Sequence, residues 1–125
     1  MRSSFLALAA LSAALAVAMG AFGAHALKTV LTAEMLAVYN TAVKYQMWHA
    51  LGLGLVALVQ QHNEDNVLLH WAGRLMFVGI VLFSGSLYLL VLLDWPRLGM
   101  ITPLGGVSWL IAWCLLLAYA AKKQD

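Results

Sequence analysis

The stretch SSFLALAALSAALAVAMGAFGAHAL, residues 3–27, contains no Asp, Glu, Lys or Arg. Its apolar part, residues 5–24, has the length of about 20 residues that a helix needs to cross the hydrocarbon core of a bilayer. A secretory signal is the competing interpretation, because Arg2 precedes the run and residues 24–26, Ala-His-Ala, resemble a cleavage site. The apolar core of such a signal is shorter, about 7 to 15 residues, so we interpret residues 4–26 as a retained membrane span.

Three further apolar runs follow, at about residues 42–61, 75–93 and 103–121. The second run is the least clear, because its purely apolar part, residues 50–59, is about half as long as a span requires. It follows an amphipathic segment, residues 32–44, in which apolar side chains recur at helical spacing. The sequence therefore predicts an all-α membrane protein with a single domain, residues 1–125. We expect a four-transmembrane-helix bundle with a short interfacial amphipathic helix before the second span.

The composition excludes several classes of protein. The 125 residues are 64% hydrophobic and 10% charged, whereas soluble domains are about half apolar and a quarter charged. Four spans leave room only for tails and short loops, so we expect no separate soluble catalytic domain. The net charge is +2, but the cations do not form a basic patch, so we expect no nucleic-acid partner.

An even number of spans places both termini on the same side of the membrane. Cytoplasmic segments of membrane proteins carry an excess of Lys and Arg. The side with the termini holds Arg2, Arg74, Lys122 and Lys123, and the other side holds Lys28, Lys44 and Arg97. This small excess favours cytoplasmic termini.

Small residues in the spans indicate where helices pack closely. Ser12, Ala16, Gly20 and Ala24 form a stripe at spacing four along the first span, and small residues let membrane helices approach each other. Glycine pairs in the other spans offer similar surfaces: Gly52 and Gly54, Gly79 and Gly85, and Gly105 and Gly106. We interpret all of these residues as packing positions.

Polar residues gather near one face of the predicted bundle. His25 ends the first span, and Tyr45, Gln46 and His49 begin the second, with the last two on one side of a helix. Thr102 opens the fourth span and returns to the same face. Polar side chains inside a membrane usually face the bundle interior. We therefore predict a candidate polar pocket of His25, Tyr45, Gln46, His49 and Thr102.

The two histidines of this pocket leave several roles open. Imidazole binds zinc, copper or iron, but no nearby Cys and no intramembrane carboxylate completes a ligand set. Proton relays usually contain an intramembrane Asp or Glu as well. We therefore expect no metal site and no cofactor. A structural role, in which His25 and His49 hydrogen-bond neighbouring helices, has at least as much support as a ligand role.

A second polar patch lies in the third and fourth spans. It consists of Ser84, Ser86, Tyr88 and Ser108. A nucleophilic serine needs an adjacent base and an orienting acid, and no carboxylate lies at this depth. We therefore expect no catalytic residue and no enzymatic activity.

Four blocks of the sequence resemble the signature of one family. They are GAFGAHAL at residues 20–27, Tyr45-Gln46 with His49, LFSGSLY at residues 82–88, and TPLGGVS at residues 102–108 with Trp113. Together they are similar to a bacterial inner-membrane family, number 423 among the domains of unknown function, which is related to eukaryotic transmembrane protein 256. The resemblance covers essentially the whole chain. It implies a small multi-pass protein of the bacterial inner membrane and assigns no role to any residue.

Three classes of function are compatible with these features. We favour an accessory or binding module that holds a membrane lipid, a quinone or a protein partner, including a second copy of the chain. Short loops and packing stripes without a catalytic constellation support this class. The alternative is a small-solute channel or transporter, formed by one bundle or an oligomer, whose path the polar residues would line. An enzyme acting on a lipid ranks last, because the spans lack the acid and base that it needs.

Overall fold

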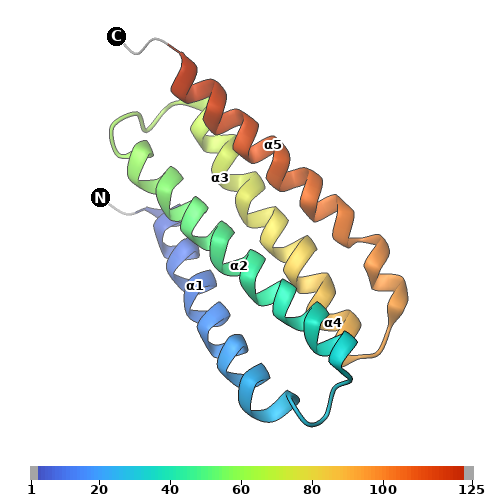
Figure 1. Ribbon diagram of the computed structural model, residues 1–125. Coiled ribbons are helices and arrows are strands. Elements are labelled where there is room, and N and C mark those ends of the chain that lie inside the picture. Colours follow the sequence, from blue (N-terminus) through green and yellow to red (C-terminus); the bar gives the residue numbers. More distant parts are fainter. Residues whose placement is uncertain (1–2, 123–125) are drawn as a thin grey trace.

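A computed structural model describes residues 3–122, and every regular element in that range is a helix (Figure 1). The predicted all-α class is therefore confirmed. The helices run in four columns along the chain. These are α1 (Ser4–Phe22) with the π-helical turn η1 (Gly23–Leu27); α2 (Ala33–Gln60); α3 (Val67–Gly79), the π-helical η2 (Ile80–Ser84) and α4 (Gly85–Leu92); and the 3₁₀ turn η3 (Pro96–Met100) with α5 (Thr102–Ala121).

Local signals in the sequence explain where the columns begin and end. Ser3, Thr32 and Asn66 each accept a hydrogen bond, at 3.1 Å, from the backbone N–H three residues ahead. Such caps satisfy N–H groups that the first turn of a helix leaves unpaired. The third column ends before Asp94, whose φ is 52°, and Pro96 follows. A left-handed residue and a proline together stop the helical ladder.

Two of the helices extend beyond the predicted spans, as helices can at either membrane surface. The amphipathic segment at residues 32–44 and the second predicted span at residues 42–61 form one helix, α2, of 28 residues. The column that contains the third predicted span begins at Val67 instead of residue 75, because Asn66 caps it.

Three helical segments of the described chain are long and apolar enough to cross a membrane: Ser4–Leu27, Val67–Leu92 and Pro96–Ala121. By composition α2 is not among them, because polar residues interrupt its first half. At a rise of about 1.5 Å per residue, however, its length is about 42 Å. A crossing by α2, and with it the four-span bundle, remains a prediction. Of the charges that indicate the topology, Arg2 and Lys123 lie outside the described residues.

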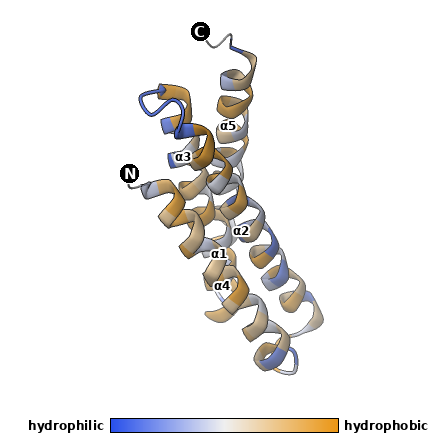
Figure 2. Ribbon diagram, turned by 90° about the vertical axis from the view of Figure 1, so that its left-hand side faces the viewer, coloured by the Kyte–Doolittle hydropathy of each residue, from blue (hydrophilic) through white to orange (hydrophobic). Residues whose placement is uncertain are grey.

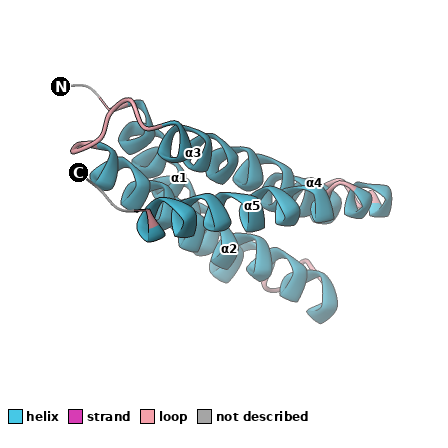
Figure 3. Cartoon of the chain, turned by 90° about the horizontal axis from the view of Figure 1, so that it is seen from above, coloured by secondary structure: helices cyan, strands magenta, loops and turns pink. Residues whose placement is uncertain are grey.

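The four columns pack in a simple order. The central columns are α2 and α3–α4, with α1 against α2 and α5 against α3 (Figures 1 and 3). Leu53, Met76 and Trp109 are buried together where α2, α3 and α5 meet. The outer surfaces of the helices are largely apolar, and polar residues are concentrated in the loop between α2 and α3 and in the first half of α2 (Figure 2). This distribution fits a bundle surrounded by lipid.

The small-residue stripe on α1 faces α2 along most of its length. Ser12 and Ala16 are buried, and Gly20 lies against α2, whereas the predicted fourth member, Ala24, is exposed. Four residues turn a helix by about 40° more than one full turn, so a stripe at spacing four rotates away from its partner. Gly23 replaces Ala24 at the interface and lies against the ring of Tyr39.

One glycine of each predicted pair makes the close approach. Gly52 lies against the ring of Trp113, Gly79 against the indole of Trp109, and Gly105 against the backbone of Phe83. The other members, Gly54, Gly85 and Gly106, have open or ordinary surroundings.

Candidate functional site

Gln46 joins three helices from a buried position on α2. Its Nε2 donates a hydrogen bond of 2.8 Å to the backbone oxygen of Ser12 on α1, and its Oε1 accepts one of 2.6 Å from the hydroxyl of Tyr88 on α4. The ring of Tyr39 meets Tyr88 edge-on, and its hydroxyl donates to the backbone oxygen of Met19 at 2.6 Å. Both hydrogen-bonding ends of the Gln46 amide are therefore used to hold helices together.

His49 lies one turn further along α2, and both of its ring nitrogens form hydrogen bonds. Its Nδ1 is 2.8 Å from the backbone oxygen of Tyr45, and its Nε2 is 3.1 Å from the indole nitrogen of Trp113. A carbonyl only accepts and an indole only donates, so His49 is neutral and carries its proton on Nδ1. Its ring stacks on Trp109 with 3.7 Å between the ring centroids. This arrangement leaves neither ring nitrogen free for a metal or a ligand.

The predicted second polar patch is divided among separate contacts. Tyr88 bonds to Gln46, while Ser86 shares a hydrogen bond of 2.6 Å with Thr102. Ser84 and Ser108 each donate to a backbone oxygen of a neighbouring helix; their acceptors are Ala42, at 2.8 Å, and Leu75, at 2.7 Å. Serine hydroxyls in these positions link helices and are not paired with a base.

The structure brings only part of the predicted pocket together. Gln46 and His49 are buried, Tyr45 is half-buried beside them, and Thr102 bonds elsewhere. His25 is exposed in η1, and within residues 3–122 no hydrogen bond or ring contact joins it to the other four residues. Every buried side-chain nitrogen or oxygen in the described chain has a hydrogen-bond partner. The buried polar side chains of the described interior therefore bond to the protein itself.

Two tryptophans on α5 form hydrogen bonds to neighbouring helices. Trp113 donates to His49, and Trp109 donates to the backbone oxygen of Met76 at 3.0 Å. A buried indole N–H usually needs such an acceptor, which was the available signal in the sequence. No group of three His, Cys, Asp or Glu side chains in residues 3–122 is arranged to hold a metal ion.

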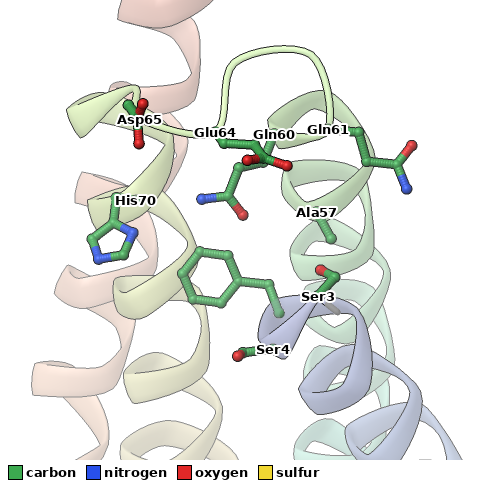
Figure 4. Close-up of a pocket in the computed structure, with 9 residues that line it drawn as sticks. Ser3, Ser4, Ala57, Gln60, Gln61, Glu64, Asp65 and His70 are labelled. Carbon is green, nitrogen blue, oxygen red and sulfur yellow. The ribbon is translucent and has the colours of Figure 1, made fainter. Parts of the chain in front are cut away.

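Two cavities open at the seam between α1 and α2. The first, which we name the end pocket, has a volume of about 450 Å³ and lies where α1 begins, α2 ends and α3 begins (Figure 4). The ring of Phe5 reaches across it toward α3, where it packs against Gly73 and lies 6.0 Å from the ring of His70. The full lining consists of Ser3, Ser4, Phe5, Ala57, Gln60, Gln61, Glu64, Asp65 and His70.

The second cavity, the α1–α2 groove, has a volume of about 420 Å³ and an entirely apolar lining. Its walls are Leu6, Ala9, Ala10, Ala13, Ala50, Leu51, Gly54, Leu55 and Leu58. Phe5 of the end pocket precedes Leu6 of the groove, and Ala57 of the end pocket precedes Leu58 of the groove, so the two cavities adjoin on both helices. Small side chains on both helices leave this space unfilled.

Sequence patterns did not reveal these cavities, because their residues come from three separate segments. The sequence contains only weak indications of the two cavities. Ala10, Ala13 and Gly54 are small residues outside the tight helix contacts, and Glu64 and Asp65 lie in the loop beside the apolar run.

Comparisons with known proteins agree with the apolar helices. A family model described as "Protein of unknown function (DUF423)" matches residues 19–106. "UPF0382 membrane protein YwdK" of Bacillus subtilis (strain 168) is 48% identical over 118 residues, which cover 94% of this chain and 96% of the relative. A "UPF0382 membrane protein" of Staphylococcus epidermidis is 46% identical over 118 residues, or 94% of this chain and 95% of the relative. No solved structure matches significantly. This chain is thus a membrane protein and belongs to the DUF423 family.

Proposed function

We propose that this protein is a binding module of the membrane that holds a lipid along the seam between α1 and α2. The observation that carries the proposal is the α1–α2 groove, an open apolar cavity that adjoins the polar end pocket at Leu6 and Leu58. A lipid has the same order of parts, an apolar chain and a polar head. Each volume lies in the range of about 300 to 1,000 Å³ typical of small-molecule sites.

The position of the groove on the bundle favours a lipid over a water-borne ligand. Leu51, Leu55 and Leu58 line it and are 62%, 46% and 55% exposed, so the groove opens on an apolar outer surface. An acyl chain would enter it directly from the bilayer. We place the module in the bacterial cytoplasmic membrane with four spans and both termini in the cytoplasm.

The polar interior gives less support to a channel or an enzyme. Gln46, Ser84 and Ser108 would line a solute path, but each donates a hydrogen bond to a backbone oxygen of another helix. Opening a path through them would break these bonds inside the membrane, where unpaired polar groups are costly. We therefore favour a binding role without catalysis over the small-solute channel.

Native mass spectrometry after purification in a mild detergent tests lipid binding. We expect the protein to retain lipid, and Ala10→Phe to lower the retained amount about tenfold, because the new ring fills the α1–α2 groove. Ala18→Phe is the matched control, since Ala18 is exposed on the same helix outside the groove.

Three results would contradict the proposal. The first is a wild-type protein that retains no lipid, and the second is equal retention by the Ala10→Phe and Ala18→Phe variants. The third is a quinone or a protein partner bound in place of a lipid and displaced by Ala10→Phe, because the groove would then have a different occupant.

A further inference from the structure

The end pocket indicates which kind of lipid the α1–α2 groove holds, an inference that rests on the function proposed above. We propose that the end pocket binds the headgroup of a zwitterionic aminophospholipid of the phosphatidylethanolamine type. The pocket places a negative and a positive electrostatic pole at the polar end of an apolar groove, and a headgroup of this type carries the complementary charges.

The negative pole is formed by two neighbouring carboxylates. Glu64 and Asp65 lie in the loop that covers the pocket, on the side opposite the start of α1 (Figure 4). Within the described chain neither forms an ion pair with a Lys, Arg or His side chain. A primary ammonium group carries a positive charge and three hydrogen-bond donors, so it complements carboxylates in this position.

The positive pole is the beginning of α1. The backbone N–H groups of the first helical turn have no partner within the helix, and the helix dipole adds a partial positive charge there. Ser3 caps the N–H of Leu6, which leaves the N–H groups of Ser4 and Phe5 facing the end of the bundle. Helix N-termini of this kind accept phosphate groups.

The cavity connects these two poles, and further polar side chains complete its wall. Gln60 and His70 lie between the loop and the start of α1 and offer hydrogen bonds to a headgroup. A phosphate at the start of α1 and an ammonium at the loop would each meet a complementary group. An anionic headgroup without an amine, such as phosphatidylglycerol, would leave Glu64 and Asp65 unneutralised.

The depth of the pocket agrees with a headgroup. The apolar run of α1 begins at Phe5, so the pocket lies where the helix would pass from the hydrocarbon core to the interface. The chains of the same lipid would then follow the α1–α2 groove toward the centre of the membrane.

A lipid competition experiment tests the inference. The purified protein is incubated with equal amounts of phosphatidylethanolamine, phosphatidylcholine and phosphatidylglycerol of identical acyl chains, and native mass spectrometry counts each bound species. We expect phosphatidylethanolamine to exceed phosphatidylglycerol about fivefold and to exceed phosphatidylcholine, whose quaternary ammonium donates no hydrogen bond. In Glu64→Gln/Asp65→Asn the ratios should fall to about one while total bound lipid stays the same.

Glu34→Gln is the matched control, because Glu34 is an exposed carboxylate at the start of α2, at the opposite end of that helix. It should keep the wild-type ratios. Equal binding of the three lipids by the wild type, or unchanged ratios in the double variant, would overturn the headgroup inference and leave lipid binding intact. Absence of all three lipids from the wild type would instead overturn the proposed function.

Discussion

Gln46 shows how one polar side chain can hold a membrane bundle together. It bonds to α1 through Ser12 and to α4 through Tyr88, so its removal would loosen two interfaces. Hydrogen bonds between membrane helices contribute modestly on average, about 0.6 kcal/mol each, with larger values up to about 1.7 kcal/mol. Two bonds from one buried amide should therefore have a measurable effect.

Replacement of Gln46 by Leu should lower the free energy of unfolding by about 1–2 kcal/mol, because it removes both bonds and leaves the Tyr88 hydroxyl without its acceptor. Tyr88→Phe should cost less, and the Gln46→Leu/Tyr88→Phe double variant should cost less than the sum of the two. Unfolding of the purified variants in mixed micelles would give this coupling energy. Strictly additive effects would show that the two side chains do not interact.

His49 provides a spectroscopic prediction. Its contacts require a proton on Nδ1 and a bare Nε2 that accepts from Trp113. Nitrogen NMR of histidine-labelled protein should therefore show a neutral ring in the Nδ1–H form. Trp113→Phe should shift the Nε2 resonance and leave the Nδ1 bond to Tyr45 in place. A dominant Nε2–H form in the wild type would contradict the assigned contacts.

These two residues also show what sequence reasoning could reach. The short apolar part of the second run predicted that Gln46 and His49 lie inside the bundle, and both are buried. Their partners were not predictable, because Tyr88 is 42 residues from Gln46 and Trp113 is 64 residues from His49. Such pairs depend on the register of packed helices. His25 is exposed although Gly23 and Leu27 of the same turn are buried, so its side chain lies on the side of the turn away from the bundle.

Packing between the helices depends on glycine at particular positions. In the third column, Gly79 lies against the indole of Trp109, whereas Gly85 has no neighbouring atom within 4 Å of an added Cβ. Both are helical glycines of one apolar column, so composition and spacing alone did not distinguish them.

Gly79→Ala should destabilise the fold by about 1–3 kcal/mol, because the methyl group would force α3 and α5 apart and displace Trp109 from its bond to Met76. Gly85→Ala should be neutral or stabilise the helix by up to about 1 kcal/mol, since alanine favours a helix more than glycine does. Thermal unfolding of the two purified variants compares them directly. Equal loss in both would contradict the close contact at Gly79.

The arrangement of the helices was predicted better than the spaces between them. Long apolar runs predicted the columns because membrane spans have a fixed length and carry few charges. The continuity of α2 follows from the lack of Pro or Gly between the amphipathic segment and the second apolar run, whereas the start of α3 at Val67 depends on the Asn66 cap. The end pocket and the α1–α2 groove form where side chains of different size on neighbouring helices meet. No single segment of the sequence therefore predicts them.

The membrane crossing of α2 determines the topology of the whole bundle. Its first half is too polar to identify it as a span by composition, but Gln46 and His49 have all their hydrogen bonds inside the bundle. Because these bonds offset much of the cost of polar groups in a membrane, we expect α2 to cross. The loop before α2 and the loop after it would then lie on opposite sides.

Labelling of single cysteines with a membrane-impermeant maleimide tests this crossing. Cys114 is first replaced by Ala, and cysteine is then introduced at Thr29, before α2, or at His62, after it; both native residues are exposed. In intact cells Thr29→Cys should react, and His62→Cys should react only after the membrane is permeabilised, because the proposed topology places the second loop on the cytoplasmic side with both termini. Reaction of both cysteines from one side would mean that α2 does not cross and that the bundle has three spans.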